Sequence, residues 1–195
     1  KSLFTDMGME ITSDAMQIFG GYGYTKDQGI EQLYRDNRIT PIYEGTNSVQ
    51  AIDLVFRKLI NKNGNIIGNY IQLIQKDIEK NKKNSETKLF AEILNKYLKT
   101  LIDFTAWIEN CMKSSKDDVS AACNDYLKVL GLVAVGYSWL KVLDVSYKEI
   151  KNNKIFFEDK IETAKFFYDR ILPRIDTHYK SGISGSKNIM NFKFN

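Results

Sequence analysis

Proline, cysteine and histidine are scarce in this sequence, and each scarcity excludes a class of structure or site. Two prolines among 195 residues leave helices few interruptions, so long helices are favoured. The two cysteines, Cys111 and Cys123, have no CxxC spacing, and we interpret them as reduced, intracellular, core-filling residues. The single histidine, His178, is too little for a His-rich metal site or a Ser–His–Asp triad, so we expect no bound metal.

Long apolar runs and an excess of one charge are also missing. The longest apolar run, Val129 to Leu140, is too short to cross a bilayer, so we predict no membrane span. The net charge of +4 is spread over mixed acids and bases, and we therefore expect no nucleic-acid binding. The sequence starts without Met and directly in a helical pattern, which we interpret as a fragment of a longer protein. For that protein we predict the cytoplasm, or the mitochondrial matrix in a eukaryote.

Apolar residues recur at three- and four-residue spacings in the first part of the chain, which predicts amphipathic helices rather than strands. These helices are expected at residues 1–19, 27–37 and 46–59. Gly20 and Gly21, followed by Gly23, should end the first helix in a flexible loop. Pro41 should end the second, because proline disfavours a helical residue before it. Thr46 is a good cap for the third.

Beyond a break at residues 61–65 the sequence predicts longer helices with little punctuation. We expect them at about residues 66–79, 88–112, 115–152 and 157–180, with Ser115 to Asp118 supplying the cap and acids of the third. Their inward aliphatic residues and their stripe of Phe and Tyr should form the core. The last should be kinked near Pro173, and the tail from Gly182 should be loose. The predicted fold class is all-α: an antiparallel helical bundle in a first domain, residues 1–62, followed by a second helical bundle, residues 63–195.

A cluster of glycine, polar and aromatic residues at 14–60 exceeds what the packing of a bundle requires. The run Gln17-Ile18-Phe19-Gly20-Gly21 puts an amide and bare backbone at a helix end, where a phosphate or an adenine could approach closely. A glycine that only ends the helix explains the same residues. The run does not fit the GxGxxG fingerprint, because Lys26 stands at the last glycine position.

Glu44 lies in a predicted turn before the third helix, next to Gly45, which leaves space for a ligand. A carboxylate there can act as a general base if burial raises its pKa towards the working pH. It can also be an acid favoured by the positive end of a helix dipole, and the residues alone leave both readings open. We interpret Arg35, Asp36 and Arg38 as an ion-pair set that fixes the loop before Glu44.

Three stretches taken together resemble the C-terminal signature of acyl-CoA dehydrogenases. They are Gln17 to Tyr24, Tyr34 to Ile39 and Ile42 to Thr46, and they agree with the family in order, spacing and residue type. Gln50 to Leu54 with Arg57 and Lys58 resembles one branch, whose members carry an extra helical domain, as methylmercaptopropionyl-CoA dehydrogenases do. Arg170 to Arg174 is similar to the last helix of that extension.

The resemblance implies roles for individual residues. Glu44 matches the family's base, which removes the α-proton of an acyl-CoA thioester while a β-hydride passes to N5 of FAD. The backbone N–H of this Glu then polarises the thioester carbonyl. Matching substrate-binding positions are Tyr43, as a pocket wall, and Gly45. Matching FAD-binding positions are Thr46, Asn47 and Ser48, and, for the FAD of a neighbouring subunit, Gln17, Ile18, Phe19, Gly20 and Gly21.

The resemblance thus implies a parent enzyme that uses FAD, acts on acyl-CoA and forms a homo-oligomer, a dimer or a tetramer. Its expected electron acceptor is an electron-transfer flavoprotein. An acyl-CoA oxidase that uses oxygen would carry the same Glu44, so the motif does not separate the two. Residues 1–195 alone could also be a helical assembly module, and we expect them to be inactive by themselves, because family members hold most of the flavin in other domains. The extension after residue 65 should cover the substrate channel or a subunit interface.

Overall fold

The computed structural model describes residues 1–59 and 65–192, which form helices and turns with no strand among them. This confirms the predicted all-α class. The chain divides into two compact units, Lys1–Leu54 and Val55–Asn195. The sequence predicted a break at residues 61–65 and a domain boundary after residue 62. That boundary lies in residues 60–64, outside the described residues.

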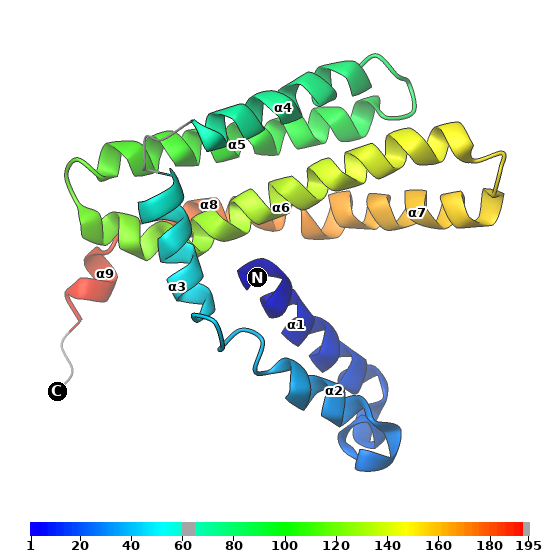
Figure 1. Cartoon of the computed structure of the whole chain (residues 1–195), viewed down its shortest axis with the longest axis horizontal. Coiled ribbons are helices and arrows are strands. Elements are labelled where there is room, and N and C mark those ends of the chain that lie inside the picture. Colours follow the sequence, from blue (N-terminus) through cyan, green and yellow to red (C-terminus); the bar gives the residue numbers. More distant parts are fainter. Residues whose placement is uncertain (60–64, 193–195) are drawn as a thin grey trace. The chain divides into compact units, whose positions relative to one another are not determined.

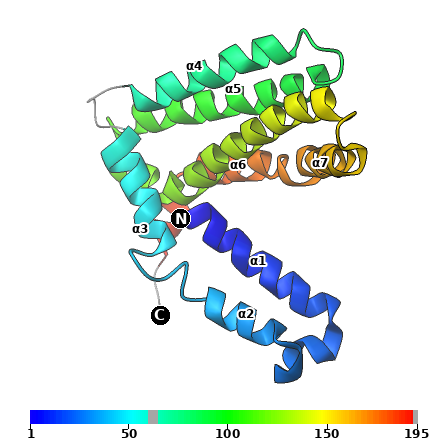
Figure 2. The same cartoon turned by 45° about the vertical axis from the view of Figure 1, so that its right-hand side comes forward.

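The first unit, Lys1–Leu54, contains three α-helices and two short 3-10 helices. They are α1 (Ser2–Ile18), η1 (Gly20–Tyr24), η2 (Lys26–Gln28), α2 (Ile30–Asn37) and α3 (Asn47–Ile52). Helices α1 and α2 lie side by side in both views (Figure 1, Figure 2). The glycines after α1 were expected to form a flexible loop, but they form the turn η1 instead. Helix α2 begins later than predicted because Gly29 before it adopts a left-handed φ of 71°.

Thr46 caps α3 as predicted, because its Oγ1 accepts a hydrogen bond from the N–H of Val49. After Ile52 the chain continues as a π-helical stretch, Asp53–Leu59. The predicted extent of this helix, to Leu59, is therefore confirmed, but its second half has wider turns than an α-helix.

The second unit is a bundle in which the first four helices are joined by short turns and each runs antiparallel to the one before, while the fifth continues along the line of the fourth (Figure 1). They are α4 (Ile66–Asn81), α5 (Lys88–Cys111), α6 (Lys116–Glu149), α7 (Lys154–Phe166), α8 (Arg174–Gly182) and α9 (Lys187–Met190). Helix α6 is central and packs on α5, α7 and α8. A π-helical stretch, Phe167–Ile171, precedes Pro173, which confirms the predicted interruption there.

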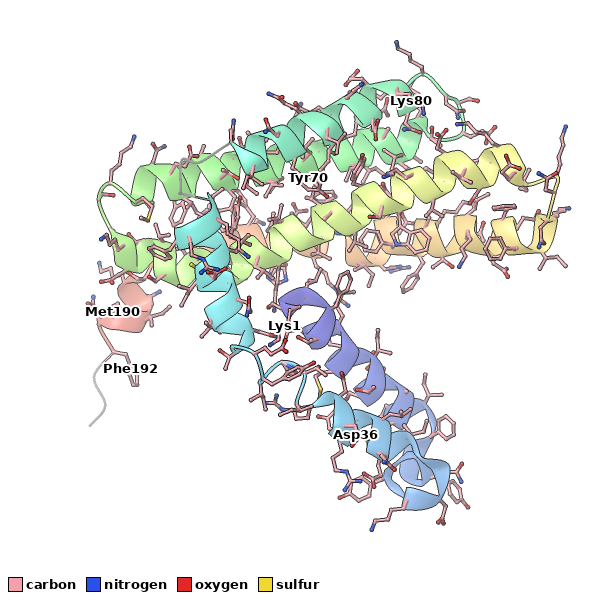
Figure 3. All side chains as sticks on the ribbon, in the orientation of Figure 1. Lys1, Asp36, Tyr70, Lys80, Met190 and Phe192 are labelled. Atoms are coloured by element: carbon pink, nitrogen blue, oxygen red, sulfur yellow. The ribbon has the colours of Figure 1, made fainter. Side chains whose placement is uncertain are left out.

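The core of the second unit is the predicted aromatic and aliphatic stripe. Buried Phe104 packs edge-on against Tyr126 and Tyr179, with ring centroids 5.4 Å apart in both pairs. Buried Tyr168 donates its hydroxyl proton to the carbonyl oxygen of Gly136 at 2.8 Å. Tyr70 of α4, labelled in Figure 3, packs edge-on against a tyrosine of α6. The stripe is therefore packing, as predicted.

Cysteine and histidine are also used for packing and local bonding. Both cysteines are free; Cys123 is buried and Cys111 is partly exposed. Burial raises the pKa of the Cys123 thiol to about 11, which keeps it protonated at neutral pH. His178 lies half-buried with Nδ1 at 2.8 Å from Oδ1 of Asp125 on α6, so it joins α8 to α6.

One described helix, α6, is long and apolar enough to cross a membrane by length and composition. Its most apolar window has a mean hydropathy of 1.4, and 44% of that window is buried. A core helix that packs on several neighbours meets the same criterion, as does a true span. The sequence-based prediction of no membrane span rested on the shorter apolar run Val129 to Leu140, whereas α6 extends over Lys116–Glu149. That there is no membrane span stays a prediction.

The tail after Gly182 is ordered as far as α9, so the prediction of a loose tail was wrong for these residues. Ser186 is buried, and its N–H and Oγ both donate to Oδ1 of Asp118 at 2.7 Å. Asp118 lies in the first turn of α6, which Ser115 caps as predicted. This bond joins residues far apart in the sequence, so no local pattern could have predicted it.

Candidate active site

Glu44 has a backbone conformation that no other described non-glycine residue shares: its φ is +54°. Gly45 follows with φ of +80°, so two successive residues are left-handed in the turn between α2 and α3. For a residue with a side chain this conformation costs about 1 kcal/mol or more, and such strain is concentrated at functional sites. The Glu44 side chain is exposed. Residues 1–54 therefore do not supply the burial expected for a general base.

The turn is tied down through its carbonyl groups. The Gln50 side-chain amide donates to the carbonyl oxygen of Glu44 at 2.8 Å, and Lys1 Nζ donates to that of Gly45 at 2.9 Å. Figure 3 labels Lys1 at the start of α1. The N–H of Glu44, in contrast, finds no acceptor among the described residues. The turn thus fixes its oxygens internally and leaves a backbone donor for another molecule.

Asn47, the first residue of α3, connects this turn to α1. Its Nδ2 donates to Oδ1 of Asp6 at 2.6 Å, to Oγ1 of Thr5 at 2.9 Å and to the carbonyl oxygen of Ser2 at 3.3 Å. Its Oδ1 accepts from Lys1 Nζ at 2.9 Å. Both ends of the Asn47 side chain are therefore bonded to α1 or to the residue before it.

The predicted substrate and cofactor residues next to Glu44 are gathered in one place. Tyr43 is half exposed, and its ring centroid lies 6.0 Å from Lys1 Nζ. Thr46 and Ser48 are exposed at the start of α3, while the side chain of Asn47 is half-buried. Exposed Thr46 and Ser48 thus lie within four residues of Glu44 in the chain.

The other predicted cofactor stretch, Gln17 to Gly21, lies at the opposite end of α1. Thr5, which contacts Asn47, is separated from Ile18 by about 20 Å of helix at 1.5 Å per residue. Gln17 is exposed, Ile18 is 84% exposed, and added Cβ atoms on Gly20 and Gly21 would meet no atom within 4 Å. Phe19 in the middle of the stretch is also exposed. The structure therefore does not bring the two predicted cofactor stretches together in one compact site.

The ion-pair set predicted from Arg35, Asp36 and Arg38 does not fix the loop before Glu44. All three side chains are exposed, and Arg35 Nε lies 3.7 Å from Oε2 of Glu31, one helical turn earlier. Asp36 is labelled on α2 in Figure 3. That prediction was wrong in residues 1–54, because hydrogen bonds from Lys1 and Gln50 restrain the turn instead.

Three residues of the site were not singled out for it from the sequence: Lys1, Asp6 and Gln50. Lys1 and Asp6 lie more than forty positions before the residues they bind. Gln50 lies only six residues after Glu44 and could have been suspected, because a helix that starts at Asn47 turns its side chain back to the preceding loop. In the described part of the chain no group of three His, Cys, Asp or Glu side chains is arranged to hold a metal.

Comparison with known families decides where the chain belongs. The family described as "Acetyl-CoA dehydrogenase C-terminal like" matches residues 70–193, and "Acyl-CoA dehydrogenase, C-terminal domain" matches residues 1–59. The chain belongs to the acyl-CoA dehydrogenase family. The resemblance noted in the signature stretches is therefore confirmed, and it extends over the second unit of this family member as well.

Individual relatives of this acyl-CoA dehydrogenase family member agree. A 3-methylmercaptopropionyl-CoA dehydrogenase of Ruegeria pomeroyi is 29% identical over 178 residues, which cover 88% of this chain and 30% of the relative. A broad-specificity linear acyl-CoA dehydrogenase of Mycobacterium tuberculosis is 26% identical over 172 residues, 83% of this chain and 28% of the relative. The chain thus spans less than a third of the length of these two curated relatives.

A solved structure shares the fold. It is an acyl-CoA dehydrogenase complexed with FAD from Bacillus anthracis, with a TM-score of 0.67 and 21% identity. The match covers 93% of this chain and 32% of the solved one. At that identity the likeness supports the helical fold of this family member and nothing finer.

Proposed function

We propose that this chain is part of an FAD-dependent acyl-CoA dehydrogenase and that Glu44 is the base of its reaction. One observation carries the assignment: Glu44 is held in a strained left-handed turn, with its carboxylate exposed and its backbone N–H without an acceptor among the described residues. Backbone strain of this kind is uncommon outside glycine and is concentrated at reactive groups.

The chemistry follows from the two groups that Glu44 offers. Its carboxylate accepts the α-proton of an acyl-CoA thioester while a hydride leaves the β-carbon, so that a carbon–carbon double bond forms. FAD, when bound, supplies the acceptor for that hydride. The N–H of Glu44 donates to the thioester carbonyl oxygen, where negative charge develops as the α-proton leaves. Both groups belong to one residue, so the strained backbone fixes the direction of both.

The residues around the turn fit the edge of a flavin nucleotide. Thr46 and Ser48 present exposed hydroxyl groups beside Glu44, while Gln17 and the open backbone of Gly20 and Gly21 are exposed at the far end of α1. Asn47 would contribute through its backbone, since its side chain bonds to α1. In this proposal the two stretches contact cofactors in different subunits, and the enzyme works as a homo-oligomer.

The wider setting is part of the same proposal. The substrate is an acyl-CoA, an electron-transfer flavoprotein takes up the electrons, and the enzyme works in the cytoplasm or the mitochondrial matrix. The second unit, Val55–Asn195, covers the substrate channel or a subunit interface. One relative is named for a single acyl group and the other for linear acyl-CoAs in general, so acyl-CoA is the level at which they support a substrate.

The test uses the full-length protein loaded with FAD and its Glu44→Gln variant. Under anaerobic conditions we expect the variant to keep its FAD and to reduce it about 10²–10⁴-fold more slowly with an acyl-CoA, because general-base catalysis contributes that much. The acyl-CoA series should include a methylthio-propionyl thioester. Asp27→Asn, which changes an exposed acid of η2, is the matched control. Near wild-type flavin bleaching by Glu44→Gln would remove Glu44 from the mechanism.

A second arm addresses the electron acceptor. Oxygen uptake by the wild-type enzyme without any added acceptor would favour an oxidase of the same family, and dependence on a flavoprotein acceptor supports the dehydrogenase. Residues 1–195 expressed alone should bind little or no FAD, and a yellow preparation of them would contradict that expectation.

A further inference from the structure

We propose that Asn47 is a positioning residue for Glu44, and that its side-chain amide sets the register between α1 and the Glu44 turn. The proposal rests on the proposed function, because it assumes that the placement of Glu44 limits the reaction. It assigns the Asn47 side chain to the base rather than to the flavin. Asp6 and Lys1 are the partners through which it acts.

The amide of Asn47 has a defined orientation. Its Nδ2 faces the carboxylate of Asp6 at 2.6 Å, and its Oδ1 faces the ammonium group of Lys1 at 2.9 Å. The reversed amide would put oxygen against a carboxylate and hydrogens against an ammonium. Only a side chain with a donor at one end and an acceptor at the other satisfies both partners. Asp lacks the donor, and Leu lacks both.

Two further hydrogen bonds connect Asn47 and its partner Lys1 to the turn that contains Glu44. Lys1 Nζ bonds at once to Asn47 and to the carbonyl oxygen of Gly45, the residue after Glu44. The N–H of Asn47 donates to the carbonyl oxygen of Pro41 at 3.2 Å and so closes the loop that contains Glu44. Asn47 is therefore at the base of the strained turn, and loss of its side-chain amide would leave Lys1 as the tie between the turn and the start of α1.

Both polar atoms of the Asn47 side chain are already bonded to neighbours within residues 1–54. A change of this side chain should therefore alter the placement of the carboxylate while the amount of bound FAD stays the same. A displacement of about 1 Å at a reacting group can lower a rate by about 10²-fold. The expected signature is a fall in kcat with KM and flavin content unchanged.

The test exploits the direction of the amide in the full-length, FAD-loaded enzyme. Asn47→Asp sets two carboxylates against each other and should slow flavin reduction by about 10- to 100-fold. The double variant Asn47→Asp with Asp6→Asn reverses the donor and the acceptor, so that residue 6 now donates and Lys1 keeps its acceptor. It should recover to within about threefold of wild type. Asp14→Asn, an exposed acid on the same helix, is the control and should have no effect.

A further readout separates positioning from general loss of structure. With a substrate deuterated at the α-carbon, the isotope effect should increase in Asn47→Asp, because proton abstraction becomes slower than other steps, and return in the double variant. If Asn47→Asp does not fold, Lys1→Met removes the tie to Gly45 instead and should give a smaller loss in the same direction.

Three results would overturn the proposal. They are an unchanged rate in Asn47→Asp, a folded double variant that is no faster than the single one, and a loss of FAD with an unchanged rate per bound flavin. The last would assign the side chain to the cofactor. Failure here is distinct from failure of the proposed function, which shows as an active Glu44→Gln enzyme whatever Asn47 does.

Discussion

The side-chain amide of Gln50 donates to the carbonyl oxygen of Glu44 at 2.8 Å, so α3 holds the turn that precedes it. Gly45 leaves room for this contact, because an added Cβ there would lie 3.1 Å from Gln50 Nε2, closer than most Cβ contacts. A side chain of α3 thus restrains the backbone of the proposed base. The restraint opposes the relaxation of a left-handed glutamate towards an ordinary conformation.

Gln50→Leu should slow flavin reduction by about tenfold in the full-length enzyme, because a lost hydrogen bond is worth about 0.5–1.5 kcal/mol and the turn can then relax. Gln50→Glu should slow it more, since a carboxylate cannot donate and repels the carbonyl oxygen. Rapid mixing with an acyl-CoA measures both. Gln32→Leu on the exposed side of α2 is the control. Equal rates in all three variants would mean that Gln50 does not restrain Glu44.

Gly182→Ala should destabilise the second unit by about 1–3 kcal/mol, as overpacking of a core does. An added Cβ would lie 2.2 Å from Cζ of buried Phe104, whose ring is enclosed by other aromatic rings. Helix propensity works in the opposite direction, since Ala is better than Gly by about 1 kcal/mol. Urea unfolding of the whole chain, residues 1–195, decides which effect dominates, and exposed Ser181→Ala is the control. A more stable Gly182→Ala would show that the ring moves aside.

The ionised carboxylate of Asp118 should hold the segment that contains Ser186, so this contact should weaken when acid protonates Asp118. Hydrogen bonds from Ser186, and then from Ser115, hold the pKa of the Asp118 carboxyl below its ordinary value. A lowered folded-state pKa gives stability that is complete above the unfolded-state pKa of about 3.9 and is lost as the pH falls through the folded-state pKa. Asp118→Ala should therefore be less stable than wild type at pH 6, and the difference should shrink below about pH 4.

Proteolysis gives an independent measure of that contact. At neutral pH, trypsin should cut after Lys187 faster in Asp118→Ala than in wild type, because α9 no longer docks through Ser186. Asp117→Ala removes an exposed acid from the same first turn of α6 and controls for the helix dipole. If both variants are cut at the wild-type rate, the segment is held by other contacts.

The parts of the fold that depend on local chemistry could be predicted from the sequence. Thr46 and Ser115 cap the helices that they were expected to cap, because a side-chain oxygen needs only the next turn of backbone. The interruption before Pro173 follows in the same way from the missing N–H of proline. Helical periodicity likewise identified the buried face of α5 and α6.

The contacts of Lys1 and Asp6 that fix the candidate site could not be predicted, because they join distant residues. Nothing near Lys1 in the sequence indicates that its side chain bonds to Gly45, and Asp118 gives no sign of Ser186. The sequence suggested instead that the arginines near Asp36 would fix the loop, since opposite charges close in sequence are easy to pair. The roles of Glu44, Tyr43, Gly45 and the cofactor residues stay predictions, of which Glu44→Gln tests the first.

The left-handed backbone of Glu44 sets stability against activity at a single residue. Glycine adopts this conformation without strain, so Glu44→Gly should make the first unit more stable by about 1 kcal/mol while it removes the carboxylate. A selection for heat resistance alone would therefore favour loss of the proposed base. An engineering campaign on this enzyme should leave position 44 out of its stability library and look for gains in the second unit.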